Sequence, residues 1–178
     1  MTSRGAALFQ RVDAFEQRFG LRLNRGCHRR AVRETFKVVS RLGDGIFWYV
    51  LLLLIPVWYG EAGLLPAAQM GVMALVGIAL YKLLKERLVR ERPYITCERI
   101  LLGTAPLDRY SFPSGHTLHA VSFTTIAVAH FPELGWVLVP FAGMVAASRV
   151  VLGLHYPTDV LAGALLGASL ATFGLVFF

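Results

Sequence analysis

Polar clusters border the apolar segments of this chain at three places. They are Lys85 to Arg92-Pro93, then Pro113-Ser114-Gly115-His116, and then Ser148-Arg149 followed by His155 and Asp159. Charged and titratable groups at the ends of membrane helices are costly to bury. Their accumulation at these positions therefore indicates a functional site.

The residue types in these clusters favour binding of a phosphate group. Lys85, Arg92 and Arg149 supply three cations, and two of them are guanidinium groups whose fork matches phosphate oxygens. Ser114 and Gly115 precede an apolar run that is expected to be helical. The unpaired N–H groups and the positive dipole end of that helix would then face an anion.

Two histidines add the groups that a phosphoryl transfer needs. One imidazole can attack phosphorus while the other protonates the departing oxygen. Asp159 follows His155 by four residues, so that its carboxylate can accept the proton on the second ring nitrogen and fix the tautomer. The sequence therefore predicts His155, His116 and Asp159 as catalytic residues.

These spacings resemble the type-2 phosphatidic acid phosphatase superfamily, which also includes glucose-6-phosphatase and the vanadium haloperoxidases. The family pattern is Lys-x6-Arg-Pro, then Pro-Ser-Gly-His, then Ser-Arg-x5-His-x3-Asp, and residues 85–159 contain it in order without a substitution. The likeness extends to the five apolar segments only by topology.

The resemblance implies a role for each matched residue. His155 would be the nucleophile that forms a phosphohistidine, Asp159 its orienting partner, and His116 the general acid for the leaving group. The phosphate cradle would be Lys85, Arg92, Ser114, Gly115 and Arg149. No metal or other cofactor is implied for the hydrolases of this family, because arginine and lysine supply the positive charge.

Five apolar segments must position these groups. They are expected at about 45–60, 63–84, 116–131, 134–152 and 158–178. Most approach the ~20 residues that a helix needs to cross a bilayer. The chain is 56% hydrophobic. It is therefore predicted to be an all-α integral membrane protein with the helical core of the phosphatase and haloperoxidase family. Gly163, Ala164 and Gly167 in the last segment would permit close helix contact.

The first 44 residues are expected to form a basic, amphipathic region ahead of a transmembrane phosphatase domain at 45–178. Leu8, Val12, Phe15 and Phe19 recur at helical spacing, which favours a helix lying on the membrane surface. A helix packed on another part of the protein is the alternative. The basic stretch 22–41 is either in contact with anionic lipid or a solvated face.

The distribution of charge predicts the orientation. With five crossings, all 18 Lys and Arg residues fall on the side of the N-terminus and the long polar stretch at 85–113. The positive-inside rule then places the N-terminus and the site in the cytoplasm of a bacterial inner membrane. The excess of basic residues, which gives a net charge of +7, is therefore attributed to the orientation in the membrane, and no nucleic-acid partner is expected. No secretory signal is recognised at the N-terminus.

Other polar and aromatic residues have simpler interpretations. Asp44, between two glycines, is expected to cap the first apolar helix, with a direct role in the site as the alternative. His28, His119 and His130 are taken as structural or solvated. His155 and Asp159 as metal ligands would be a weaker alternative, because nearby cations would repel a metal. An aromatic belt at the membrane–water interface is expected from four residues, Trp48, Tyr49, Trp58 and Tyr59.

The predicted function is a metal-independent membrane lipid phosphatase. Its substrate would be a lipid phosphomonoester or diphosphate in the bilayer, such as phosphatidylglycerophosphate, phosphatidic acid or a polyprenyl phosphate. An undecaprenyl diphosphate phosphatase is the alternative, and a catalytically inactive binding relative is a remote one. The head group and the oligomeric state cannot be read from the residues.

Overall fold

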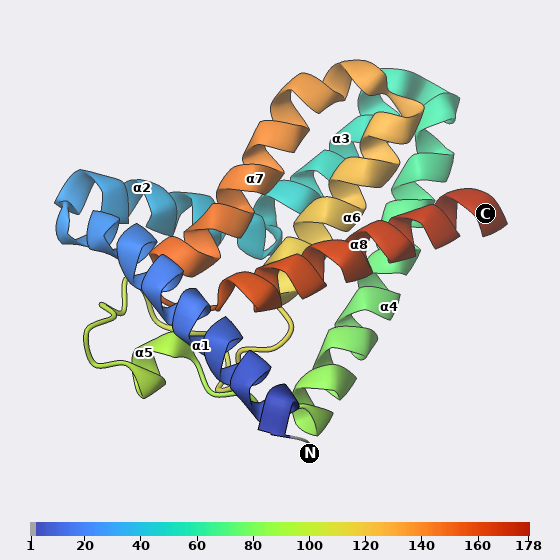
Figure 1. Ribbon diagram of the computed structural model, residues 1–178. Coiled ribbons are helices and arrows are strands. Elements are labelled where there is room, and N and C mark those ends of the chain that lie inside the picture. Colours follow the sequence, from blue (N-terminus) through green and yellow to red (C-terminus); the bar gives the residue numbers. More distant parts are fainter. Residues whose placement is uncertain (1–2) are drawn as a thin grey trace.

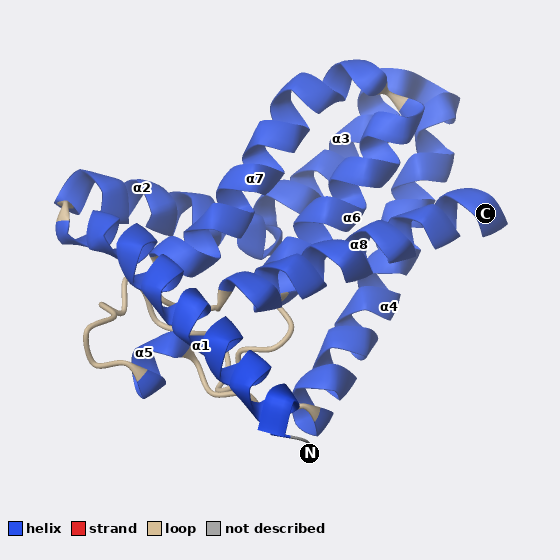
Figure 2. Cartoon of the chain, in the orientation of Figure 1, coloured by secondary structure: helices blue, strands red, loops and turns tan. Residues whose placement is uncertain are grey.

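Helices form nearly all of the regular structure (Figures 1 and 2). The computed structural model describes residues 3–178, with side chains from residue 14 onward, and this range contains no strand. The α-helices are α1 Ser3–Asn24, α2 Arg30–Arg41, α3 Phe47–Tyr59, α4 Leu64–Arg87, α5 Pro93–Thr96, α6 Gly115–His130, α7 Gly135–Val151 and α8 Pro157–Phe177. The predicted all-α class is confirmed.

Each of the five predicted apolar segments contains one helix, in the order α3, α4, α6, α7 and α8. Within residues 3–178, three helical stretches are long and apolar enough to cross a membrane: Arg30–Arg87, Pro132–Val151 and Pro157–Phe177. The first of these holds α2, α3 and α4, whereas α6 has only 16 residues. The membrane-protein class is thus confirmed, and the count of five crossings stays a prediction.

Helix α6 lies inside the bundle, between α4, α7 and α8 (Figure 1). Two glycines of α8 bring that helix against the backbone of α6. A Cβ at Gly163 would lie 2.5 Å from the carbonyl oxygen of Ser114, and one at Gly167 would collide with the carbonyl oxygen of Leu118. The predicted close contact at these two glycines is confirmed, and it positions the start of α6 beside the start of α8.

The two tight turns lie at the same end of the bundle (Figure 1). Tyr59, before the first turn, donates a hydrogen bond of 2.7 Å to Glu133 in the second. Its ring also stacks on Phe131 with the ring centroids 3.6 Å apart. The opposite end carries the long loop at 88–114 and the short connection between α7 and α8. This arrangement agrees with the threading predicted from the sequence.

One member of the predicted aromatic belt belongs to the core instead. Trp48 is fully buried, and its indole Nε1 donates a hydrogen bond of 3.2 Å to the carbonyl of Gly43. It packs against Phe123 and Phe141. Tyr49 and Trp58 are exposed as expected. The assignment of Trp48 was wrong because an aromatic residue in an apolar run can face either lipid or the protein interior.

The N-terminal helix packs on the rest of the protein through polar side chains. Glu16 and Asn24 are buried on the side of α1 that faces α7 and α8. Asn24 donates to the carbonyls of Leu101 and Val151 at 2.9 and 2.8 Å. The inner face of α1 is therefore packed on the rest of the protein, which was the alternative to a helix lying on the membrane surface. The outer face exposes Phe15 and Phe19, while Leu8 and Val12 lie outside the described side chains.

Candidate active site

The three polar clusters line one cavity of about 140 Å³ at the loop end of the bundle. Each cluster comes from a different helix end, because α4, α6 and α7 all reach this end. The predicted site residues in its wall are Lys85, Arg92, Gly115, His116, Arg149 and His155. Both predicted catalytic imidazoles therefore face the same space. Its apolar side includes Ala74, Ile78 and Phe123.

Ser114 holds the start of α6 in place. Its backbone N–H donates to the carbonyl of Asp159 at 3.1 Å, which ties the loop before α6 to the first turn of α8. The hydroxyl is buried 3.0 Å from that of Thr117, and Ser114 is not among the residues that line the cavity. Gly115 does line it, at the helix end where backbone N–H groups have no intrahelical acceptor. A role for Ser114 through its hydroxyl stays a prediction without support from this geometry.

Lys85 and Arg92 share a carboxylate that the sequence did not reveal as part of the site. The two oxygens of Asp108 accept hydrogen bonds of 2.6 Å from Lys85 and 2.8 Å from Arg92. Burial alone would raise the pKa of Asp108, but the bonds from Lys85 and Arg92 lower it below its ordinary value. Asp108 thus stays ionised and fixes the two cations at the cavity wall.

Arg149 is a buried cation with spare hydrogen-bond donors. It is 3% exposed, and its Nη1 donates to the hydroxyl of Ser40 at the end of α2. Its Nε is buried without a partner among the described residues. A buried donor without an acceptor is costly. The Arg149 side chain also lines the cavity, where it supplies positive charge.

The imidazole of His155 lies between a cation and a carboxylate. Its Nε2 is 3.3 Å from Nη1 of Arg92, and its Nδ1 is 3.7 Å from Oδ2 of Asp159. The latter distance exceeds that of a hydrogen bond. Burial lowers the pKa of His155 to about 4. The ring is therefore neutral at pH 7, as a nitrogen nucleophile must be.

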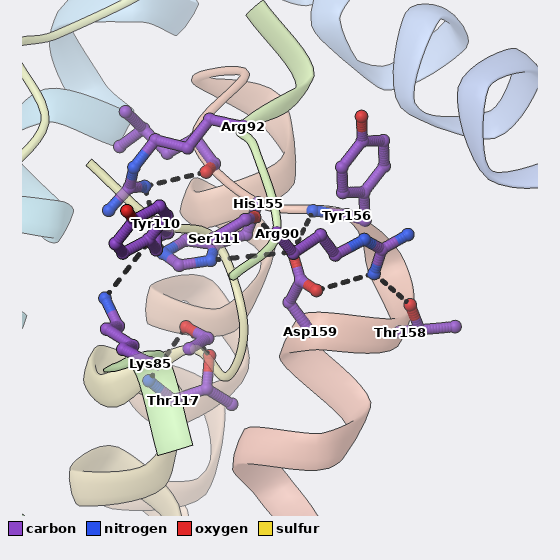
Figure 3. Close-up of polar contacts among 12 residues, drawn as sticks. Lys85, Arg90, Arg92, Tyr110, Ser111, Thr117, His155, Tyr156, Thr158 and Asp159 are labelled. Carbon is purple, nitrogen blue, oxygen red and sulfur yellow. Dashed lines mark hydrogen bonds and ion pairs between the residues drawn. The ribbon is translucent and has the colours of Figure 1, made fainter. Parts of the chain in front are cut away.

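Asp159 is the centre of a buried polar network (Figure 3). Its carboxylate accepts from the hydroxyl of Ser111, from the backbone N–H of Tyr156 at 2.8 Å and from Arg90 at 2.7 Å. Arg90 also donates to Glu16 of α1 at 2.6 Å. The network fixes the carboxylate that faces His155, and it makes α1 part of the support of the site. Sequence reasoning missed Arg90 and Glu16.

The expected cap at Asp44 is absent. No side-chain cap bond forms at the start of α3 or of the turn before it. The carboxylate of Asp44 lines the cavity instead, with Oδ1 3.2 Å from Nε2 of His116. The capping interpretation was wrong because the chain kinks at Asp44 and Gly45 rather than beginning a helix there.

The three remaining histidines divide between surface and interior. His28 is exposed, and His130 lies 2.7 Å from the amide oxygen of Gln69. His119 also lines the cavity, one helical turn beyond His116, with its ring against Tyr81 and Phe123.

Among residues 14–178, no three His, Cys, Asp or Glu side chains are grouped to bind a metal.

A family model for the PAP2 superfamily matches residues 66–178. This chain belongs to the PAP2 superfamily. The match includes the three motifs and begins inside α4. The family that the motifs indicated is therefore confirmed.

Two curated relatives carry names of lipid phosphatases. A lipid A 1-phosphatase of Rhizobium etli is 28% identical over 157 residues, covering 77% of this chain and 67% of the relative. An undecaprenyl-diphosphatase of Sulfolobus acidocaldarius is 36% identical over 95 residues, covering 52% and 46%. The chain thus spans about half to two thirds of the length of these relatives.

Two solved structures of this PAP2 fold share the architecture. Aquifex aeolicus LpxE superposes with a TM-score of 0.76 at 26% identity, covering 88% of this chain and 93% of LpxE. A PAP2-type phosphatidylglycerolphosphate phosphatase from Bacillus subtilis gives 0.63 at 26% identity, covering 90% and 85%. Relatives and structures together support the predicted class, a bacterial membrane lipid phosphatase of the PAP2 type.

Proposed function

We propose that this protein hydrolyses a phosphate ester or terminal diphosphate on a lipid whose tail stays in the bilayer. One observation carries the proposal: a small cavity at the ends of apolar helices combines three cations with the imidazoles of His116 and His155. Lys85, Arg92 and Arg149 match the negative charge of a phosphoryl group in its transition state. The apolar wall around Ala74 and Ile78 suits the first carbons of a lipid.

The reaction would proceed in two steps through a phosphohistidine. Nε2 of His155 attacks phosphorus, forming a P–N bond as the P–O bond to the lipid breaks. His116 gives its proton to the departing oxygen. Water then attacks the phosphohistidine, His116 takes a proton from that water, and inorganic phosphate leaves with His155 neutral again. Asp159 would orient the ring of His155 and stabilise its positive charge.

The substrate class is a membrane lipid carrying a phosphomonoester or a diphosphate. Phosphatidylglycerophosphate, phosphatidic acid and polyprenyl phosphates remain the candidates, and the relatives add lipid A 1-phosphate. Undecaprenyl diphosphate is the alternative substrate, favoured by the name of the archaeal relative. All of them present a tetrahedral phosphate near the membrane surface, and they differ in head group and in tail.

We further propose that the protein resides in the bacterial inner membrane with the site facing the cytoplasm. In the predicted threading, all 18 Lys and Arg residues lie on the side of the membrane that carries the long loop at 88–114, and this distribution supports the orientation. Residues 1–44 would lie on the cytoplasmic surface of the membrane. Phe15 and Phe19 are exposed on α1, beside a groove lined by Arg18, Arg22, Arg25 and Arg99. Anionic head groups would bind these arginines.

A panel of lipid phosphates offered to the purified protein in detergent tests this function. Release of inorganic phosphate from one or more of them is expected, with the head-group preference read from kcat/KM. The control is His155→Ala, which should abolish both turnover and trapping of a phosphohistidine. Turnover that survives this substitution would overturn the assigned nucleophile. Binding of a lipid phosphate without phosphate release would identify an inactive relative.

A further inference from the structure

One imidazole and one carboxylate form a pair in the cavity wall, in addition to the pair of His155 and the fully buried Asp159. Nε2 of His116, in the first turn of α6, lies 3.2 Å from Oδ1 of Asp44. Asp44 comes from the connection between α2 and α3, a segment that contains none of the three motifs. Both side chains belong to the cavity wall.

The backbone on either side of Asp44 is held firmly. Gly43 has no room for a side chain, because a Cβ there would lie 2.7 Å from a methyl group of Val145 in α7. Its carbonyl accepts the hydrogen bond from the buried Trp48. Gly45 adopts φ of 122°, a conformation that glycine tolerates best. The kink thus turns Asp44 out of the helical path and toward α6.

The charges around His116 explain why a carboxylate is needed there. The same cavity wall contains Lys85, Arg92 and Arg149, and the further titratable groups Tyr49, Tyr81, His119 and His155. Cations disfavour a protonated imidazole, whereas a nearby carboxylate favours it. Of the two carboxylates in the wall, Asp108 is bound by Lys85 and Arg92, and Asp44 faces His116.

We infer that Asp44 is a positioning residue that holds His116 in its role as general acid, an inference that rests on the proposed phosphatase reaction. The carboxylate of Asp44 would pair with the N–H at Nε2, from which it is 3.2 Å away, and leave the N–H at Nδ1 for the departing oxygen. When the P–O bond to the lipid breaks, its electron pair goes to that oxygen, which takes the Nδ1 proton. The ring is then neutral with its remaining proton on Nε2, facing Asp44.

The inference assigns each imidazole its own carboxylate. Asp159 faces Nδ1 of His155 and leaves Nε2 for phosphorus, whereas Asp44 faces Nε2 of His116 and leaves Nδ1 for the leaving group. Removal of Asp44 should therefore impair departure of the leaving group more than binding of phosphate. A purely structural role in the kink would impair both.

The test compares two substrates that differ in their need for a general acid. Phosphatidic acid loses an alkoxide, which must be protonated, whereas p-nitrophenyl phosphate loses a stable phenolate. For Asp44→Asn we expect kcat to fall about 100-fold on phosphatidic acid, the lower range for loss of general acid catalysis, and less than about 3-fold on p-nitrophenyl phosphate. Asp44→Glu should restore part of the loss. Inhibition by inorganic phosphate should change by less than about 3-fold.

Glu61→Gln is the matched control, because Glu61 is an exposed carboxylate in the turn at the opposite end of the bundle. It should leave both rates unchanged. Equal losses on the two substrates for Asp44→Asn and Asp44→Glu would overturn the inference, since they would indicate a role in folding or in the backbone kink. Unchanged rates would overturn it as well. If the wild-type protein hydrolyses neither these two substrates nor any lipid of the panel, the proposed function itself fails.

Discussion

In the proposed reaction, burial prepares His155 for nucleophilic attack. An exposed histidine is partly protonated near neutral pH, whereas removal of water from around this ring disfavours the charged form. Arg149 and Arg92 act in the same direction, and the carboxylate of Asp159 opposes them. The outcome is a neutral nitrogen beside cations that would bind the phosphate, which is the combination that phosphoryl transfer requires.

The pH profile should reveal this environment. Because the pKa of His155 is lowered to about 4, protonation removes the nucleophile only as the pH falls through that value. The acid limb of kcat/KM is therefore expected near pH 4 rather than near 6.5, the ordinary value for histidine. Initial rates in a series of buffers on the preferred lipid would measure it. An acid limb near 6.5 would show that water reaches the ring.

Arg149 should not tolerate replacement by lysine. The guanidinium donates to Ser40 through Nη1 and also lines the cavity, and a single ammonium group cannot reproduce this planar arrangement of donors. We expect Arg149→Lys to lower kcat/KM at least about tenfold, which corresponds to loss of one charge-assisted hydrogen bond of ~1.5–3 kcal/mol. The measurement is steady-state hydrolysis beside a thermal melt. Wild-type kcat/KM in a folded variant would contradict the assignment of Arg149 to the phosphate cradle.

The contact between α6 and α8 determines where the start of α6, at Ser114 and Gly115, lies. Gly163 allows the carbonyl of Ser114 to approach α8, and the N–H of Ser114 bonds to Asp159. The first turn of α6, which holds His116, and the first turn of α8, which holds Asp159, are therefore parts of one packed interface. A change in the spacing of these two helices would move His116 relative to His155.

Gly163→Ala should be damaging for this reason. The added methyl would meet a backbone carbonyl at 2.5 Å, so that the helices must separate, at a cost of about 1–3 kcal/mol in stability. A lower midpoint of thermal unfolding and a reduced kcat are expected. Gly143→Ala is the matched control, because a Cβ at Gly143 has no atom within 4 Å. Equal effects of the two substitutions would refute the packing argument.

Helix α1 should influence the chemistry from outside the cavity. Glu16 is 2% exposed and binds Arg90, which in turn binds Asp159. Glu16→Gln would leave Arg90 with one charged partner fewer and loosen its hold on Asp159. We expect kcat to fall several-fold with little change in KM, because no described side chain of α1 lines the cavity. Unchanged kcat would show that Ser111 and the backbone N–H of Tyr156 suffice to hold the carboxylate.

The two ends of the protein differ in charge. The end with the loop at 88–114 carries the cavity and, in the predicted threading, every basic residue. The other end carries the two turns joined by Tyr59 and Glu133. If membrane insertion follows the positive-inside rule, the cavity opens to the cytoplasm and the C-terminus lies outside it.

A reporter fused to the C-terminus tests this orientation. A reporter active only in the periplasm should be active there, and one active only in the cytoplasm should be silent. The reverse pattern would place the site outside the cytoplasm and favour a substrate presented on the outer leaflet. The catalytic predictions above do not depend on this result, because they concern groups within a single cavity.

The motifs and the apolar segments could be recognised without a structure. Lys85, Arg92, Arg149 and the two histidines occur at family spacings, and spacing along the chain is a local property. The helices α3, α4, α6, α7 and α8 could likewise be predicted, because an apolar run of sufficient length in a membrane must satisfy its backbone hydrogen bonds internally.

The partners of these residues emerged only from the packing of distant segments. Asp108 binds Lys85 across 23 positions, and Arg90 binds Glu16 across 74. The pairing of Asp44 with His116 depends on a backbone kink, and the burial of Trp48 depends on which side of α3 meets α6. Such contacts depend on the paths of loops and the rotation of helices, and one-dimensional patterns of charge and hydropathy do not encode either.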